Sequence, residues 1–242
     1  MTKILAVGSP KGGVAKTTEA VHLAAIAARD LRLTTLLVDA DVNHSTLQWA
    51  DRSDETSMPL DVTTATGEEA ADLAHLRRGR HYDLTVVDLA GAREGGFSTM
   101  LRGAGNRPVP DLLLMPTRPR AMDLRPVVRV LRAEVIPLGL PYLVVFTLVR
   151  TASFPAARQR QDELRNQGIE VADTIIRDYE IYNEAHETDR TVLDMPGAHS
   201  YARIAEAEQR ALAREALKPL GFNTRRLTTL LGDTDGPQNR AR

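Results

Sequence analysis

The sequence predicts an α/β fold in which a doubly wound, mostly parallel sheet carries helices on both faces. Short apolar runs rich in Val and Leu recur along the chain, and such runs suit strands that are covered on both sides. The segments between them place apolar residues three or four positions apart, as in amphipathic helices. A glycine-rich turn joins the first strand-like run to the first helical pattern. Alternation of this kind is the signature of a doubly wound sheet.

Each element follows from its own pattern. Strands are expected at residues 3–8, 34–39, 84–88, 111–116, 142–149 and 169–176. Helices are expected at residues 16–30, 68–79, 123–136, 154–168 and 201–221. The last helix should end near Pro219 and Gly221, two helix-terminating residues. Residues 1–222 are therefore expected to form a single domain, and the polar segment 223–242 a flexible tail.

Composition narrows the class of protein. The chain has 242 residues, of which 43% are hydrophobic and 26% charged, as in ordinary globular proteins. Its lack of cysteine excludes disulfides, thiolate metal sites and a cysteine nucleophile. No run is long and apolar enough to span a membrane, and the start of the sequence lacks a secretory signal pattern. A cytoplasmic protein without a membrane span is expected.

The stretch GSPKGGVAKTT at residues 8–18 has the character of a phosphate-binding loop. A loop between a first strand and a first helix points backbone N–H groups at one place, where the helix dipole also favours an anion. Glycines let the backbone curl around phosphate oxygens, Lys16 reaches the β- and γ-phosphates, and Thr17 offers a hydroxyl to Mg²⁺. The residues expected to bind the nucleotide are Lys11, Gly12, Gly13, Val14, Ala15, Lys16, Thr17 and Thr18.

Measured against the usual pattern G-x-x-x-x-G-K-[ST], the loop carries Pro10 and Ala15 where glycines belong. A side chain at position 15 costs of order 1 kcal/mol if the backbone φ there is positive. A scaffold with impaired nucleotide binding is therefore one alternative to an active nucleotide-binding protein.

The string Lys-Gly-Gly-x-x-Lys-Thr-Thr resembles the deviant Walker A motif of the ParA/MinD superfamily of P-loop ATPases. The resemblance implies that Lys16 serves its own nucleotide and that Lys11 reaches across an ATP-dependent homodimer to the nucleotide of the other subunit. It also implies ATP and ADP as ligands, Mg²⁺ as cofactor, and slow hydrolysis to ADP and phosphate. Lys11, Lys16 and Asp41 would be the catalytic residues.

Two further segments support the resemblance. LLVDADVNHSTLQWA is similar to the switch I region of the family, in which Asp41 would position the attacking water and Asp39 ends the strand. YDLTVVDLAGAREGG is similar to the Walker B and switch II region, in which Asp88 would join the Mg²⁺ shell, usually through water. Motif order and spacing together favour this interpretation over a glycine-rich turn with surface lysines.

Within the superfamily, the expected role is that of a ParA-type protein for plasmid or chromosome partition. Such a protein binds DNA with little sequence preference, associates with nucleoid or plasmid, and is stimulated by a ParB-like partner. The basic residues proposed to contact DNA are Arg203, Arg210, Arg214 and Lys218, at helical spacing, and a second set is Arg125, Arg129 and Arg132. Pairing of the first set with acidic residues of its own helix is the plainer alternative. Trp49 is expected to pack rather than to stack on bases.

Two other functions stay open. The segment MPTRPRAMDLRPV also resembles VirC-type relatives that assist conjugative DNA transfer. A small-molecule synthetase built on a phosphate loop is the alternative of another class, although no substrate motif supports it.

Overall fold

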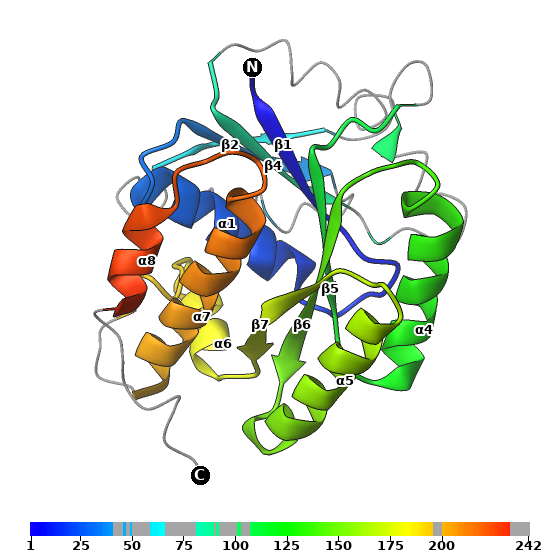
Figure 1. The fold of residues 1–242 in the computed structure, drawn as a ribbon. Coiled ribbons are helices and arrows are strands. Elements are labelled where there is room, and N and C mark those ends of the chain that lie inside the picture. Colours follow the sequence, from blue (N-terminus) through cyan, green and yellow to red (C-terminus); the bar gives the residue numbers. More distant parts are fainter. Residues whose placement is uncertain are drawn as a thin grey trace.

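A computed structural model describes residues 1–40, 46, 49, 59–65, 81–89, 91, 101–102, 107–195 and 200–232. Within these residues, seven strands form one parallel sheet in the order β3-β2-β4-β1-β5-β6-β7 (Figure 1). The strands are β1 (Lys3–Val7), β2 (Thr35–Ala40), β3 (Asp61–Thr64), β4 (Leu84–Leu89), β5 (Leu112–Thr117), β6 (Tyr142–Val149) and β7 (Val171–Arg177). The doubly wound α/β prediction is confirmed.

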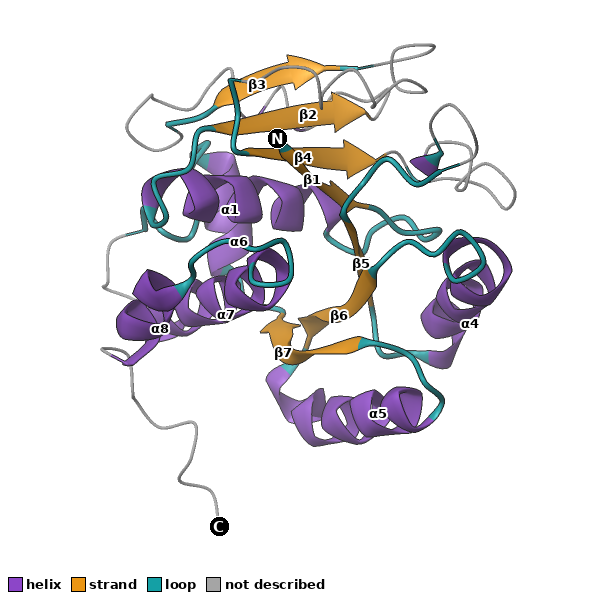
Figure 2. Ribbon diagram, turned by 45° about the horizontal axis from the view of Figure 1, so that its top comes forward, coloured by secondary structure: helices purple, strands orange, loops and turns teal. Residues whose placement is uncertain are grey.

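The sheet carries a layer of helices on each face (Figure 2). The helices are α1 (Lys16–Arg29), α4 (Ala121–Val130), α5 (Phe154–Asn166), α6 (Ile181–Glu187), α7 (Ser200–Leu217) and α8 (Arg225–Gly232). Helix α4 continues into a π-helical turn, η2 (Leu131–Val135), and a 3₁₀ turn, η3 (Thr151–Ser153), precedes α5. One apolar cluster joins the sheet to α4 and α5, and another joins it to α1, α7 and α8. Among the described helices, none is long and apolar enough to cross a bilayer.

Burial explains which strands the sequence revealed. Every residue of β1 after Lys3 and every residue of β2, β4 and β5 is buried, as the continuous apolar runs predict. Strand β3 was not predicted, because its four residues DVTT alternate between exposed and half-buried positions at the edge of the sheet. The helix predicted at residues 68–79 lies outside the described residues.

The C-terminal segment corrects one expectation. Residues 225–232 form helix α8, so the flexible tail expected from residue 223 is wrong for this stretch. Leu227 is fully buried in the cluster that also holds α1 and α7, and this burial explains why the helix docks. Residues 233–242 lie outside the described part of the chain.

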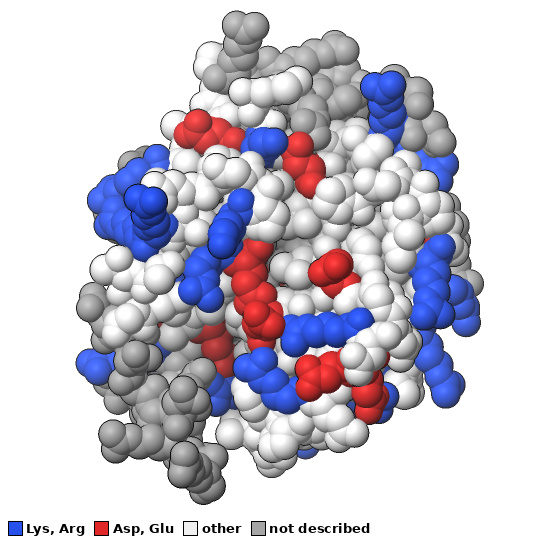
Figure 3. Space-filling model, in the orientation of Figure 1, with Lys and Arg blue, Asp and Glu red and all other residues white. Residues whose placement is uncertain are grey.

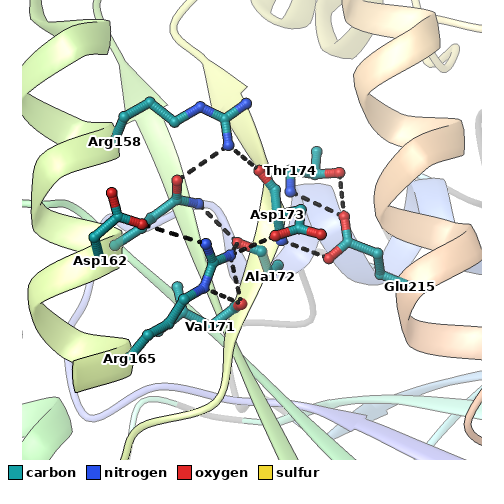
Figure 4. A network of polar contacts seen from close by, with 9 residues as sticks. Arg158, Asp162, Arg165, Val171, Ala172, Asp173, Thr174 and Glu215 are labelled. Atoms are coloured by element: carbon teal, nitrogen blue, oxygen red, sulfur yellow. Dashed lines mark hydrogen bonds and ion pairs between the residues drawn. The ribbon is translucent and has the colours of Figure 1, made fainter. Parts of the chain in front are cut away.

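Strand β7 ends the sheet, and side chains of α5 and α7 satisfy its outer main-chain groups (Figure 4). Glu215 of α7 accepts hydrogen bonds from the backbone N–H groups of Asp173 (2.6 Å) and Thr174 (2.9 Å). From α5, Arg165 donates to the carbonyl oxygens of Val171 and Ala172, each at 3.0 Å. An edge whose polar groups are already paired does not offer a template to another strand.

Candidate nucleotide-binding site

The loop between β1 and α1 has the backbone that a phosphate cradle needs. Gly13 and Ala15 both adopt left-handed conformations, with φ of 66° and 63°. Ala15 is the N-cap of α1, and no side chain among the described residues caps this helix. The first N–H groups of α1 are therefore left for another acceptor, and a phosphate is the typical one. The positive φ at Ala15 means that its Cβ costs of order 1 kcal/mol, as the sequence suggested.

A buried threonine fixes the loop to the sheet. Thr147 of β6 donates its hydroxyl to the carbonyl oxygen of Val14 at 3.0 Å, with a second acceptor, the carbonyl of Thr117, at 3.3 Å. Thr147 is fully buried. No motif predicts a role for this residue, and its one sequence signal is a hydroxyl within the otherwise apolar run YLVVFTLV.

Lys16, Thr17 and Asp88 converge at the C-terminal ends of β1 and β4. Thr17 donates its hydroxyl to Asp88 Oδ2 at 2.7 Å. The Lys16 amine lies near Gly91, 3.7 Å from the place where a Cβ on that glycine would be. The phosphate loop, the end of β4 and Gly91 thus lie close together.

Asp88 has the properties of a cation ligand. Its Oδ2 accepts hydrogen bonds from Thr17 and from Thr46, the latter at 2.8 Å, whereas its buried Oδ1 has no hydrogen-bond partner among the described residues. Burial raises the pKa of Asp88 to about 6, against the opposing effect of the two hydroxyls, and nearby Asp39 raises it further. Mg²⁺ prefers oxygen ligands, so it would bind Oδ1 and would also stabilise the ionised form of the carboxylate. The residues therefore fit a magnesium ion.

The other lysine of the loop, Lys11, has a partner within its own chain. The Lys11 amine lies 3.7 Å from Asp123 Oδ1, in the first turn of α4. The lysine side chain is 36% exposed and the aspartate 14%. The proposed water-positioning residue, Asp41, lies outside the described residues.

A cavity of about 260 Å³ adjoins the loop on the side of Thr18, between α1, the ends of β6 and β7, and α6. Its lining includes Thr18, Leu148, Asp178, Asn183 and His186. No short motif in the sequence points to this cavity, because its lining comes from separate segments of the chain.

The first turns of α1 also contain two buried ionisable residues that the sequence analysis did not single out. The pKa of Glu19 is raised to about 8 and that of His22 is lowered to about 4, in both cases chiefly by burial. His22 Nδ1 donates to the Thr18 carbonyl at 2.7 Å, and Nε2 accepts from the Val192 N–H at 3.1 Å, so the imidazole is neutral. The bond from Val192 joins the first half of α1 to the segment that precedes α7.

The basic residues proposed to contact DNA fall into two groups that differ in exposure and in ion pairing. Arg210 is paired with Asp30 at 2.8 Å and Glu206 at 2.6 Å and is 11% exposed, so it does not belong to an accessible stripe. Arg203 and Lys218 are exposed, Arg214 is half-buried, and none of the three forms an ion pair with another described residue. Trp49 is buried against His186 of α6, with ring centroids 4.8 Å apart, and its predicted packing role is confirmed.

Comparison with known proteins agrees with this geometry. Residues 5–192 match the CobQ/CobB/MinD/ParA nucleotide binding domain. The maintenance of carboxysome distribution protein A of Gloeobacter kilaueensis is 34% identical over 213 residues, which are 88% of this chain and 93% of that protein.

Two solved structures have a similar fold. The MinC:MinD cell division protein complex of Aquifex aeolicus aligns with a TM-score of 0.68 and 18% identity, over 89% of this chain and 96% of the other. The ATP complex of a Cyanothece McdA variant aligns with a TM-score of 0.67 and 14% identity, over 92% and 97%. The phosphate loop, the order of the strands and these matches together establish that the chain belongs to the CobQ/CobB/MinD/ParA family of nucleotide-binding proteins, the ParA/MinD ATPases.

Proposed function

We propose that this protein is a Mg²⁺-dependent ATPase that dimerises on binding ATP, binds DNA in that form, and positions a cargo along it. The observation that carries the proposal is the Thr17–Asp88 pair beneath an uncapped helix N-terminus, with one carboxylate oxygen unmatched among the described residues. The cargo proposed from sequence is a plasmid or chromosome. The relative at 34% identity, a carboxysome distribution protein, favours a second candidate for the cargo, a carboxysome or a similar body.

The proposal gives a part to the main groups of the site. The N–H groups of α1 and the Lys16 amine hold the phosphates, while Thr17 and Asp88 hold the magnesium ion. The ion supplies charge neutralisation for the phosphates when it is bound. The cavity beside Thr18 takes the ribose and base, and Asp41 orients the water.

Dimerisation requires Lys11 to leave Asp123 for the nucleotide of the other subunit. The pair is long and one partner is partly exposed, so its loss costs at most about 1 kcal/mol. The interaction of a lysine with a polyphosphate is the stronger of the two because the phosphates carry several negative charges.

Titration calorimetry with Mg·ATP and Mg·ADP tests the nucleotide site. Lys16→Ala should weaken binding about ten- to a hundredfold, since a hydrogen bond to a charged group stabilises by about 1.5 to 3 kcal/mol. Lys3→Ala, which removes an exposed amine away from the loop, is the control. Wild-type protein that binds neither nucleotide would identify the chain as a scaffold and overturn the proposal.

The DNA surface proposed from the fold differs from the sequence stripe. Arg214, Lys218 and Arg225 line an open hollow of about 690 Å³ where α7 meets α8, and Arg226 lies beside it in sequence and is exposed. Figure 3 shows Lys and Arg side chains gathered over this corner, and a second basic set over α4. Glu215, the acidic residue of the hollow, is engaged by the backbone of β7.

The two basic surfaces can be separated by matched charge reversals. Lys218→Glu with Arg225→Glu should abolish the ATP-dependent gel shift of a DNA fragment, because each lost phosphate contact weakens binding in a salt-dependent way. Arg125→Glu on α4 with Arg132→Glu on η2 changes the net charge by the same amount. Loss of the shift only in the α4 pair would assign DNA to that face, and a shift that is equally strong without ATP would contradict the switch.

A further inference from the structure

One contact at the metal site is not accounted for by the proposed function. Thr46 donates its hydroxyl to Asp88 Oδ2 at 2.8 Å, the same oxygen that accepts the Thr17 hydroxyl at 2.7 Å. Thr46 is fully buried, and 42 residues separate it from Asp88. A threonine in a helix commonly bonds instead to a carbonyl of the preceding turn, so this choice of acceptor has a chemical consequence.

The consequence concerns the orientation of the Asp88 carboxylate. The torsion that rotates an aspartate carboxylate is soft, so the side chain alone does not decide which oxygen faces a cation. Here two hydroxyls, from different elements, both donate to Oδ2. This arrangement leaves Oδ1 as the oxygen without a partner among the described residues.

Thr17 and Thr46 differ in whether their hydroxyls can also bind the magnesium ion. A hydroxyl that donates its proton to a carboxylate still has lone pairs for a cation, so Thr17 can bind magnesium without releasing Asp88. Thr17 stands at the start of α1, where the phosphates are proposed to bind. Thr46 belongs to neither the phosphate loop nor β4, and its contact with the site is through the carboxylate.

We propose that Thr46 is a positioning residue of the magnesium site, whose hydroxyl holds the Asp88 carboxylate so that Oδ1 faces the ion or its water. The inference rests on the proposed function, because it requires that magnesium binds with the nucleotide. It acts through Asp88 and assigns no contact between Thr46 and the ion.

A second buried residue lies close to Thr46 in the sequence. Thr46 and Trp49 are three residues apart, and both are buried and in helical conformation. The Trp49 ring meets His186 of α6 edge-on at 4.8 Å and His22 of α1 at 6.0 Å between ring centroids. Because both histidines belong to packed helices, these contacts hold the Trp49 ring in place, and Trp49 is the only tryptophan of the chain.

The test compares Thr46→Val, which keeps the shape and removes the donor, with Thr46→Ser, which keeps the donor. Calorimetry measures the affinity for ADP with excess Mg²⁺ and with a chelator. We expect Thr46→Val to leave the magnesium-free affinity unchanged and to lower magnesium affinity about tenfold, since the loss of a group that orients a metal ligand typically has this effect. Thr46→Ser should restore most of the magnesium-dependent gain.

Trp49 fluorescence reports whether each variant is folded, because loss of its contacts with His186 and His22 shifts the emission. If Thr46→Val does not fold, Thr46→Ala serves as the donor-free variant. A magnesium-dependent gain that the donor-free variant keeps in full overturns the inference and leaves the proposed function intact. An equal loss with and without magnesium would show a purely structural role and also overturn it. Wild-type protein without any magnesium-dependent gain would overturn the proposed function and the inference with it.

Discussion

The phosphate-loop end of the sheet and the β7 edge differ in how their polar groups are used. At the β7 edge, carboxylate, amide and guanidinium groups from two helices pair with the strand's own N–H and carbonyl groups (Figure 4). At the loop, within the described part of the chain, α1 has no side-chain cap and Asp88 Oδ1 has no partner, and Ala15 adopts a left-handed conformation. Paired groups stabilise a fold, whereas unmatched groups that face one place stabilise the complex with a ligand.

The largest effect on folding stability is expected at Glu19, a buried acid beside the loop. Its pKa is raised from 4.5 to about 8, so the folded protein binds a proton that the unfolded chain releases between these values. The stability that this proton contributes is complete below pH 4.5 and is lost as pH rises towards 8, by at most about 5 kcal/mol. Urea unfolding of wild type and Glu19→Gln without nucleotide, from pH 5 to about 8, measures the difference. If the two stabilities change in parallel with pH, Glu19 is not protonated in the folded protein.

The second prediction concerns the β7 edge. Glu215→Gln retains one acceptor but loses the charge that two backbone N–H groups and the Thr174 hydroxyl share, so we expect a loss of about 2 kcal/mol. Glu170→Gln, an exposed change just before the same strand, should alter stability by less than about 0.5 kcal/mol. Denaturant titration compares the two. Equal values would mean that the edge network does not stabilise the fold.

The third prediction tests strain at the loop. Ala15→Gly removes a Cβ from a residue with φ of 63° and should stabilise the protein by about 0.5 to 1 kcal/mol. Thermal unfolding without nucleotide measures this change. Ala27→Gly, in the second half of α1, is the control: glycine weakens a helix, so this change should destabilise the protein. A destabilising Ala15→Gly would show that the loop does not store strain at this residue.

The smallest effect is expected at Asp123. Asp123→Asn removes the charge that faces Lys11 and should change stability by at most about 1 kcal/mol, because the lysine is partly exposed. Light scattering should show a larger dimer fraction with ATP, up to a few-fold, since Lys11 no longer has to leave a carboxylate. Asp162→Asn, on exposed α5, is the matched control. A smaller dimer fraction than in wild type would mean that Asp123 belongs to the interface itself.

The fold and much of the site could be predicted from the sequence because their signals are local. Strands buried on both faces read as continuous apolar runs, as in β4 and β5, and the loop depends on glycines, lysines and threonines at fixed spacing. Helical spacing placed Arg210 and Arg214 on one stripe, but it could not show that Asp30, the C-cap of α1, would pair with Arg210 from 180 residues away. The tail was misjudged for a similar reason, since the burial of Leu227 depends on neighbours from other helices.

What the sequence determined by itself is the parallel sheet and the phosphate loop, because residue type and periodicity within a few turns of chain specify both. Only the tertiary structure decided which groups at that site have hydrogen-bond or ion-pair partners. Thr147 reaches Val14, Asp123 reaches Lys11 and Thr46 reaches Asp88 across separations that no local pattern records. The physical reason is that a hydrogen bond or ion pair depends on a fraction of an ångström between atoms, and packing of the whole chain sets that distance.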